Sequence, residues 1–120
     1  MRPVRVAPKA VIVDDGRLLT VHMHGSKGEY YMLPGGGHET GETLEATLRR
    51  ECHEEIGTEV EVGKLLWVRD YMEKNHEFAD LRPGFHQLEI MFECWLLGEP
   101  DMDCRGDTRQ MGLALSLIHI

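Results

Sequence analysis

Three carboxylates lie close together near the middle of the chain, in a pattern that suits the binding of a cation. Glu51, Glu54 and Glu55 fall within five residues. An α-helix advances by about 100° per residue, so Glu51 and Glu55 lie one turn apart on the same face, with Glu54 beside them. Carboxylate oxygens at this spacing suit a hard cation such as Mg²⁺ or Mn²⁺, and they do not suit zinc. The spacing therefore indicates a metal site on a helix.

The same carboxylates have a second interpretation that needs no metal. Acidic runs on helices are usually solvated faces, and Arg50 offers a simple ion-pair partner. Against this, like charges at i,i+4 destabilise a helix by about 0.2–0.5 kcal/mol per pair, and partial burial raises that cost. Leu44 and Leu48 border the acidic side and place it at the edge of the buried stripe. On the helix alone, both interpretations stay open.

A glycine loop precedes the helix. Pro34 is followed by Gly35, Gly36 and Gly37. Because glycine has no Cβ, the backbone here can approach a ligand closely, and a carbonyl could complete the oxygen shell of a metal. No Gly-Lys-Ser/Thr follows, so the loop is not a nucleotide P-loop. On the glycines alone, an ordinary turn is the simpler interpretation.

Length and charge limit the class of protein. A chain of 120 residues predicts one domain. The net charge is −8 and no cluster of Lys or Arg is present, which argues against a nucleic-acid polymer or a membrane surface as partner. The sequence carries no long apolar segment and no signal pattern, so we expect a cytoplasmic protein. Cys52, Cys94 and Cys104 show no CxxC spacing and predict neither disulfides nor a zinc site.

The hydrophobic pattern predicts strands on both sides of one helix. The helix is expected over residues 43–56, with Thr43 as N-cap, Gly57 as stop, and an apolar stripe at Leu44, Leu48, Cys52 and Ile56. An α+β fold, a sheet with a helix packed on it, is the class that this order favours. The strands are predicted over residues 10–13, 18–21, 30–33, 60–68, 87–97 and 110–115.

Loop and helix together resemble the Nudix box of the MutT-like Nudix hydrolases. Gly36 is followed after five residues by Glu42, and after seven more by the run from Arg50 to Thr58. All seven fixed identities of the box are present at the family spacing. Thr58 departs from the pattern, because an aliphatic residue is usual at this packing position.

The resemblance implies a fold and a set of roles. The fold would be a Nudix-type α/β/α sandwich with a mixed β-sheet, and the cofactor would be Mg²⁺ or Mn²⁺. Arg50 would orient a box glutamate, and Glu42 would support the loop. The metal ligands would be Glu51, Glu54, Glu55 and the Gly35 carbonyl, and the substrate would contact the loop at Gly35, Gly36 and Gly37.

The implied reaction is hydrolysis of a diphosphate linkage in a nucleoside diphosphate-X substrate, with ADP-ribose or a nucleotide sugar favoured. The products would be a nucleoside monophosphate and a phosphorylated remainder. A (d)NTP pyrophosphohydrolase of the housecleaning type is the alternative. A non-catalytic nucleotide-sensing module is the third, and the intact box glutamates disfavour it. We expect a small-molecule partner, and a homodimer is the assembly to test.

The general base is not fixed by the box. Glu51 is a candidate within it, and Asp107 ranks first outside it because it precedes the predicted last strand. The segment 73–85 is either a substrate lid or a surface loop. Glu73, Glu77, Glu89 and Glu93 are the other base candidates, and Tyr30, Tyr31, Trp67, Phe85 and Trp95 include candidates for stacking on a base, although most are expected in the core.

The end of the chain is unusual for the family. Residues 115–120 are mostly apolar and resemble a translated sequencing adapter more than a native terminus. We therefore expect that residues 1–120 form a single domain that is truncated or non-native at 115–120.

Overall fold

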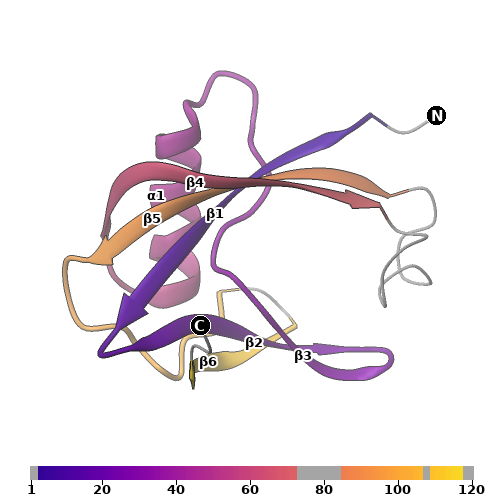
Figure 1. Ribbon diagram of the computed structural model, residues 1–120. Coiled ribbons are helices and arrows are strands. Elements are labelled where there is room, and N and C mark those ends of the chain that lie inside the picture. The colour runs from indigo at the N-terminus through magenta and orange to yellow at the C-terminus, as the bar shows by residue number, and fades with distance from the viewer. Residues whose placement is uncertain (1–2, 73–84, 107–108, 118–120) are drawn as a thin grey trace.

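The computed structural model describes residues 3–72, 85–106 and 109–117. Helix α1 is the helix within these ranges, and it packs on a mixed sheet, which confirms the α+β class (Figure 1). Each predicted element is present, and β1, β2 and β4 extend well beyond the predicted bounds. The elements are β1 Arg5–Asp14, β2 Arg17–Gly25, β3 Gly28–Met32, α1 Leu44–Ile56, β4 Val60–Met72, β5 His86–Leu96 and β6 Gln110–Leu117.

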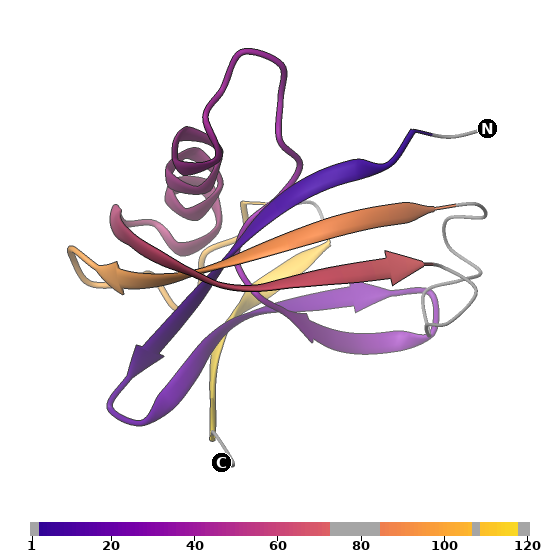
Figure 2. The same ribbon diagram turned by 45° about the horizontal axis from the view of Figure 1, so that its top comes forward.

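Strand β1 joins the two halves of the sheet. The strand order is β3-β2-β1-β5-β4, and β6 pairs with β2 off this path. The first part of β1 pairs in parallel with β5, from Arg5 opposite Gln87 to Ile12 opposite Cys94. Its last residues pair antiparallel with β2. The β4–β5 half and the β2–β3–β6 half therefore diverge on either side of β1, as Figure 2 shows.

A tight turn joins β1 and β2. Asp15 and Gly16 have φ angles of 51° and 74°. Positive φ at both central residues is typical of the turn that matches the twist of a two-residue hairpin. Asp-Gly tolerates this conformation because glycine has no Cβ and Asp is among the residues that enter it most readily.

Both ends of α1 carry the predicted caps. The Thr43 hydroxyl accepts a hydrogen bond of 3.0 Å from the Ala46 N–H, and Gly57 ends the helix at φ 84°. The apolar stripe is mostly as predicted, since Leu48, Cys52 and Ile56 are fully buried. The fourth member differs from the prediction, because Leu44 is only half-buried. These side chains meet a core formed by Ala10, Ile12, Leu19, Val60 and Cys94.

Thr47 is fully buried one turn after the N-cap, and it belongs to no apolar pattern. Its hydroxyl donates a hydrogen bond of 2.8 Å to Glu42 Oε1. A buried hydroxyl that is hydrogen-bonded avoids the cost of an unsatisfied polar group. This bond therefore lets a polar side chain take a core position and ties the start of the helix to the loop before it.

Strand β6 closes the described part of the chain. It pairs with β2 from Arg17 opposite Leu117 to Met23 opposite Gln110, and Leu113 and Leu115 pack against the core. Residues 118–120 lie outside the described residues, as do Asp107, Glu73 and Glu77. The parts of the chain that are described contain no helix with the length and hydropathy needed to cross a membrane.

Candidate active site

The glycine loop lies along β1. The Ala10 N–H donates to Pro34 O at 2.8 Å, and the His38 N–H donates to Val6 O at 2.8 Å. Gly35 has a φ angle of 138°, and a Cβ there would lie 2.2 Å from Pro8 O. No larger residue fits this contact, so the glycine is needed for the loop to dock on the strand.

The docked loop contacts two of the predicted metal ligands. The Gly35 N–H donates a hydrogen bond of 2.8 Å to Glu55 Oε1. A Cβ on Gly36 would lie 2.6 Å from Glu51 Cδ. Gly35 and Gly36 thus lie directly against Glu55 and Glu51, which are half-buried and lie one turn apart on the helix. The structure brings together the loop and the helix face that the box spacing links.

Arg50 bridges the loop and the helix through its guanidinium. Its Nε and Nη2 donate to the two oxygens of Glu42 at 2.8 and 2.9 Å, and its Nη1 donates to Glu51 Oε1 at 2.9 Å. Hydrogen bonds from Arg50, and then from Thr47, lower the pKa of Glu42 to about 2. The paired contact with Glu42 fixes the guanidinium plane, which in turn orients Glu51.

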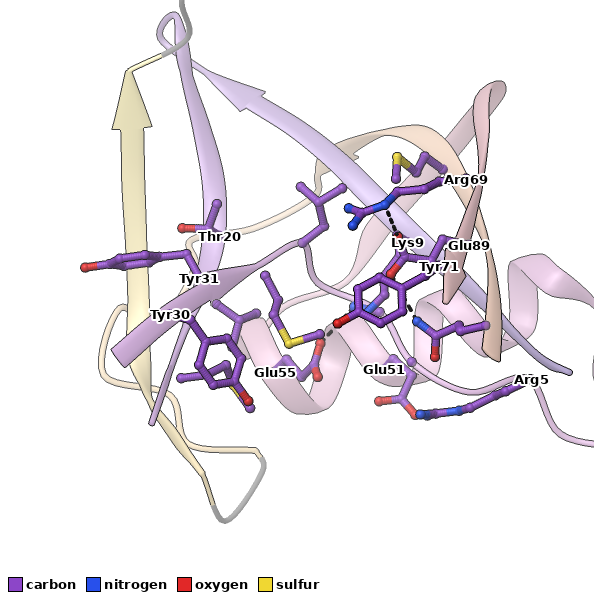
Figure 3. Close-up of a pocket in the computed structure, with 18 of the residues that line it drawn as sticks. Arg5, Lys9, Thr20, Tyr30, Tyr31, Glu51, Glu55, Arg69, Tyr71 and Glu89 are labelled. Atoms are coloured by element: carbon purple, nitrogen blue, oxygen red, sulfur yellow. Dashed lines mark hydrogen bonds and ion pairs between the residues drawn. The ribbon is translucent and has the colours of Figure 1, made fainter. Parts of the chain in front are cut away.

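A pocket of about 490 Å³ lies where the two halves of the sheet diverge. In Figure 3, Tyr30 and Tyr31 stand on the left, Arg5 and Arg69 on the right, and Glu51 and Glu55 below and between them. The lining includes apolar side chains and three kinds that bear on its chemistry. Its carboxylates are Glu51, Glu55 and Glu89, its cations are Arg5, Lys9, Arg69 and Arg109, and its aromatic rings are Tyr30, Tyr31, Tyr71 and Phe85.

Besides Arg50, which reaches the site through Glu51, two further predicted site residues lie apart from this lining. Glu54 is exposed, and its backbone carbonyl accepts a hydrogen bond of 3.1 Å from Cys104 Sγ. Gly37 lies against Arg5, whose Nε would be 2.6 Å from a Cβ at this position. Asp107, the predicted base, lies outside the described residues. The catalytic, metal-binding and substrate roles of these three residues stay predictions, as do those of the predicted site residues that line the pocket.

Among the base candidates that the structure describes, Glu51 lines the pocket from α1 and Glu89 lines it from a strand. Glu89 lies on β5, is 7% exposed, and accepts a hydrogen bond of 3.0 Å from Gln87 Nε2. Arg69 Nε on the neighbouring strand β4 lies 3.6 Å from Glu89 Oε1. The polar residues Gln87 and Glu89 alternate with the apolar residues Leu88 and Ile90. This alternation was a usable signal that one face of β5 is not core.

Lys9, Arg69 and Tyr71 were not identified from the sequence. Each is a single polar or aromatic residue within a strand, and no spacing pattern distinguishes it. The opposite error concerns the aromatic set of which most members were expected in the core, because its members Tyr31, Trp67 and Trp95 are 55%, 58% and 47% exposed. The residue type predicts a strand here without indicating which face carries the ring.

Burial shifts the pKa values of two ionisable side chains in the pocket. Desolvation raises the pKa of Glu51, and the hydrogen bond from Arg50 opposes this shift. Desolvation also lowers the pKa of Lys9, and the charge of Glu55 opposes this shift. A partly buried group of carboxylates is stable only with cations nearby.

The donor set fits Mg²⁺ or Mn²⁺ in its chemistry. Glu51, Glu55 and Glu89 supply hard oxygen atoms in one pocket, and the Gly35 backbone borders it. Within residues 3–72, 85–106 and 109–117, no three acidic, histidine or cysteine side chains already converge on a single coordination point. Hydrogen bonds from Arg50 and Gly35 hold two of the carboxylates, which gives a physical reason for the open arrangement.

A family model described as the NUDIX domain matches residues 3–115. The chain belongs to the NUDIX family. This match covers nearly the whole sequence, so the glycine loop, α1 and the strands around the pocket together form the NUDIX domain. The prediction of family and fold from the box is confirmed.

A curated relative supports the same assignment. The chain is 40% identical over 89 residues to the nucleoside triphosphatase NudI of Enterobacter sp. (strain 638), which covers 70% of this chain and 63% of the relative. The matched region therefore spans less than two thirds of the relative's own length.

Solved NUDIX structures share the fold. The MutT NUDIX hydrolase from Burkholderia pseudomallei has a TM-score of 0.76 and 28% identity, and the similarity covers 96% of this chain and 84% of that one. A NUDIX hydrolase from Nitrosomonas europaea has a TM-score of 0.78 and 23% identity, with 96% and 73% covered.

Proposed function

We propose that this chain is a divalent-metal-dependent hydrolase that cleaves a diphosphate linkage in a nucleotide. The observation that carries the proposal is the position of Glu51 and Glu55. Both face one pocket, both contact the glycine loop, and Glu51 is also held by Arg50. The pocket also contains the cationic side chains that a polyphosphate requires.

The residues of the loop and helix hold the proposed cofactor, Mg²⁺ or Mn²⁺. Glu51 and Glu55 are the principal ligands, and Glu54 and the Gly35 carbonyl are the further ligands that the family pattern predicts. Arg50 is a positioning residue, because its guanidinium holds Glu51 against the pocket. When bound, the cation neutralises phosphate oxygens and lowers the pKa of a bound water.

The remaining pocket residues bind and orient the substrate in this proposal. Arg5, Arg69 and Arg109 provide positive charge in a protein with a net charge of −8. Their positive charges attract an anionic substrate locally, which the acidic protein as a whole does not. Tyr30 and Phe85 offer rings on which a nucleobase can stack.

We favour a nucleoside triphosphate as the substrate, with a nucleoside monophosphate and pyrophosphate as products. The NudI relative, at 40% identity, is named a nucleoside triphosphatase. This support reverses the order in which the two substrate classes were expected from the sequence. The intact Glu51, Glu54 and Glu55 also argue against a non-catalytic sensing module.

A nucleoside diphosphate-X compound is the second candidate. The observation that favours it is the size and lining of the pocket. A volume of about 490 Å³, with both aromatic rings and cations in its lining, leaves room for a group beyond the diphosphate. ADP-ribose and nucleotide sugars are the compounds of this class to test first.

One substrate screen separates these candidates. The chain is incubated with (d)NTPs, ADP-ribose, nucleotide sugars and dinucleoside polyphosphates, with Mg²⁺ or with EDTA, and the products are separated by chromatography. We expect nucleoside monophosphate and pyrophosphate from a triphosphate, with Mg²⁺ only. Turnover of ADP-ribose or a nucleotide sugar, without turnover of a triphosphate, would favour the nucleoside diphosphate-X class instead. Equal turnover in EDTA would rule out the metal-dependent reaction.

A cytoplasmic setting and a homodimer are further proposals. The composition supports the first, and the second is tested by light scattering on the purified chain. A mass of twice 13.7 kDa is the expected result for the dimer. A mass of 13.7 kDa across the concentration range would contradict it.

A further inference from the structure

Lys9 is a buried cation within the carboxylate pocket. It lies on β1, is only 5% exposed, and lines the pocket together with Glu51, Glu55 and Glu89. In Figure 3 it lies beside Glu89, with Glu55 below it. Lysine is almost never fully buried unless its charge is compensated. The position of Lys9 therefore requires an explanation that includes these carboxylates.

The glycine loop holds the stem of Lys9. Lys9 and Gly35 form an isolated antiparallel bridge between strand and loop. A Cβ on Gly35 would lie 2.9 Å from Lys9 Cα and 3.1 Å from Lys9 Cδ. The loop thus packs closely against the aliphatic stem of Lys9, which lines the pocket. The same Gly35 donates its N–H to Glu55, so one residue positions both the cation and a carboxylate.

The charges around Lys9 come from three elements. Desolvation by burial lowers the pKa of Lys9, while Glu55, Glu89 and, more weakly, Glu51 raise it, and Arg5 adds to the lowering. Glu55 and Glu51 lie on α1, and Glu89 lies on β5, the parallel neighbour of β1. Arg50 hydrogen-bonds Glu51, whereas Glu55 and Glu89 are the carboxylates whose charges act most strongly on Lys9.

We propose that Lys9 is a resident cation of this pocket, which holds Glu55 and Glu89 in place in the metal-free protein and competes with the divalent cation for them. The competition half of the proposal rests on the proposed function, because it requires metal binding at Glu51 and Glu55. The claim that Lys9 holds Glu55 and Glu89 in place does not require metal binding. One buried and two half-buried carboxylates repel one another, and a fixed ammonium among them offsets that repulsion. The same ammonium repels an incoming cation.

Replacement of Lys9 by methionine tests the holding role, because Met keeps much of the stem and removes the charge. Thermal unfolding is measured in EDTA for the unchanged chain, Lys9→Met, Glu89→Gln and the double variant. We expect Lys9→Met to lower Tm by about 5 °C or more. The double variant should regain at least half of that loss, since removal of one carboxylate relieves the uncompensated charge. Losses that simply add would overturn the holding role.

Lys64→Met is the matched control, because Lys64 is exposed on β4 and lies outside the pocket lining. It should leave Tm unchanged. If Lys9→Met does not fold in EDTA, the double variant decides: a folded double variant supports the proposal and an unfolded one contradicts it. Lys9→Arg keeps the charge and should unfold much closer to the unchanged chain than Lys9→Met does.

Mn²⁺ binding tests the competition. Free Mn²⁺ is measured by electron paramagnetic resonance during a titration of each variant without nucleotide. We expect Lys9→Met to bind Mn²⁺ at least about tenfold more tightly than the unchanged chain, and Lys64→Met to bind as the unchanged chain does. Equal affinity of Lys9→Met and the unchanged chain would overturn the competition. Absence of Mn²⁺ binding by every variant would instead contradict the proposed function, and the unfolding cycle would still decide the holding role.

Discussion

The Gly35 N–H donates a hydrogen bond of 2.8 Å to Glu55 Oε1, across 20 residues of sequence. This bond joins the glycine loop, docked on β1, to the carboxylate face of α1. It is the contact that converts two separate sequence features into one site. The geometry of this contact predicts how small substitutions in the loop affect the site.

Gly36→Ala should displace the Glu51 carboxylate. An added Cβ would lie 2.6 Å from Glu51 Cδ, which is too close for the side chain to stay in place. A displacement of about 1 Å at a reacting group can lower a rate about a hundredfold, so we expect a loss of this order in kcat. Steady-state kinetics with the best substrate measure it.

Gly98→Ala is the control for this change, because its added Cβ would lie 2.6 Å from Thr58 Oγ1, a side chain outside the pocket lining. It should keep most of the activity. Similar kcat values for the two variants would show that Gly36 is not needed to place Glu51.

Arg50→Lys should weaken the site while preserving the charge. Lysine cannot make the paired contact with Glu42 and also reach Glu51, since it lacks the planar fork of arginine. Loss of a residue that orients a ligand typically costs about 10–100-fold in metal affinity or activity, and we expect a kcat effect in that range.

Arg49→Lys is the adjacent control, because Arg49 makes an exposed i,i+4 pair with Glu45. Exposed pairs of this kind contribute little, so kcat and Tm should hardly change. An equal loss of activity in both variants would remove the special role assigned to Arg50.

The Glu42–Arg50 pair predicts how stability depends on pH. The pKa of Glu42 is lowered from 4.5 to about 2, so its contribution is fully present above pH 4.5. It is lost as the pH falls from 4.5 toward 2, because the folded protein then has to protonate a carboxylate held as an anion. The difference in Tm between the unchanged chain and Glu42→Gln should therefore be constant from pH 5 to 7 and shrink below pH 4.5.

The comparison is made in EDTA by thermal unfolding at steps of pH. Glu45→Gln serves as the control, since Glu45 is more exposed and pairs only with Arg49 on its own helix. A Glu42→Gln difference that grows as the pH falls would contradict the assigned direction.

The local half of the site was accessible from the sequence. Gly36, Glu42, Arg50, Glu51 and Glu55 lie within 20 residues, and their spacing along one loop and one helix encodes their geometry. Helix periodicity then predicts which side chains share a face. The caps and the helix bounds were predicted for the same reason, since they depend on neighbouring residues.

The other half of the site depends on long-range pairing. Lys9 and Glu89 meet because β1 and β5 pair in parallel, although 80 residues separate them. Arg69 joins them through the antiparallel pairing of β4 with β5. No local periodicity specifies which strands become neighbours, so single polar residues in these strands carried little signal. The exposed Trp67 and Trp95 show the same limit, because residue type does not identify the buried face.

The most direct test of the account is the rate of nucleotide hydrolysis by Glu55→Gln, compared with Glu45→Gln on the same helix, in saturating Mg²⁺. Glu55 lines the pocket and Glu45 lies outside it. The account predicts that Glu55→Gln loses more than about a hundredfold in kcat, beyond the loss typical of outer-shell partners, while Glu45→Gln keeps nearly full activity. Full activity in Glu55→Gln would contradict it.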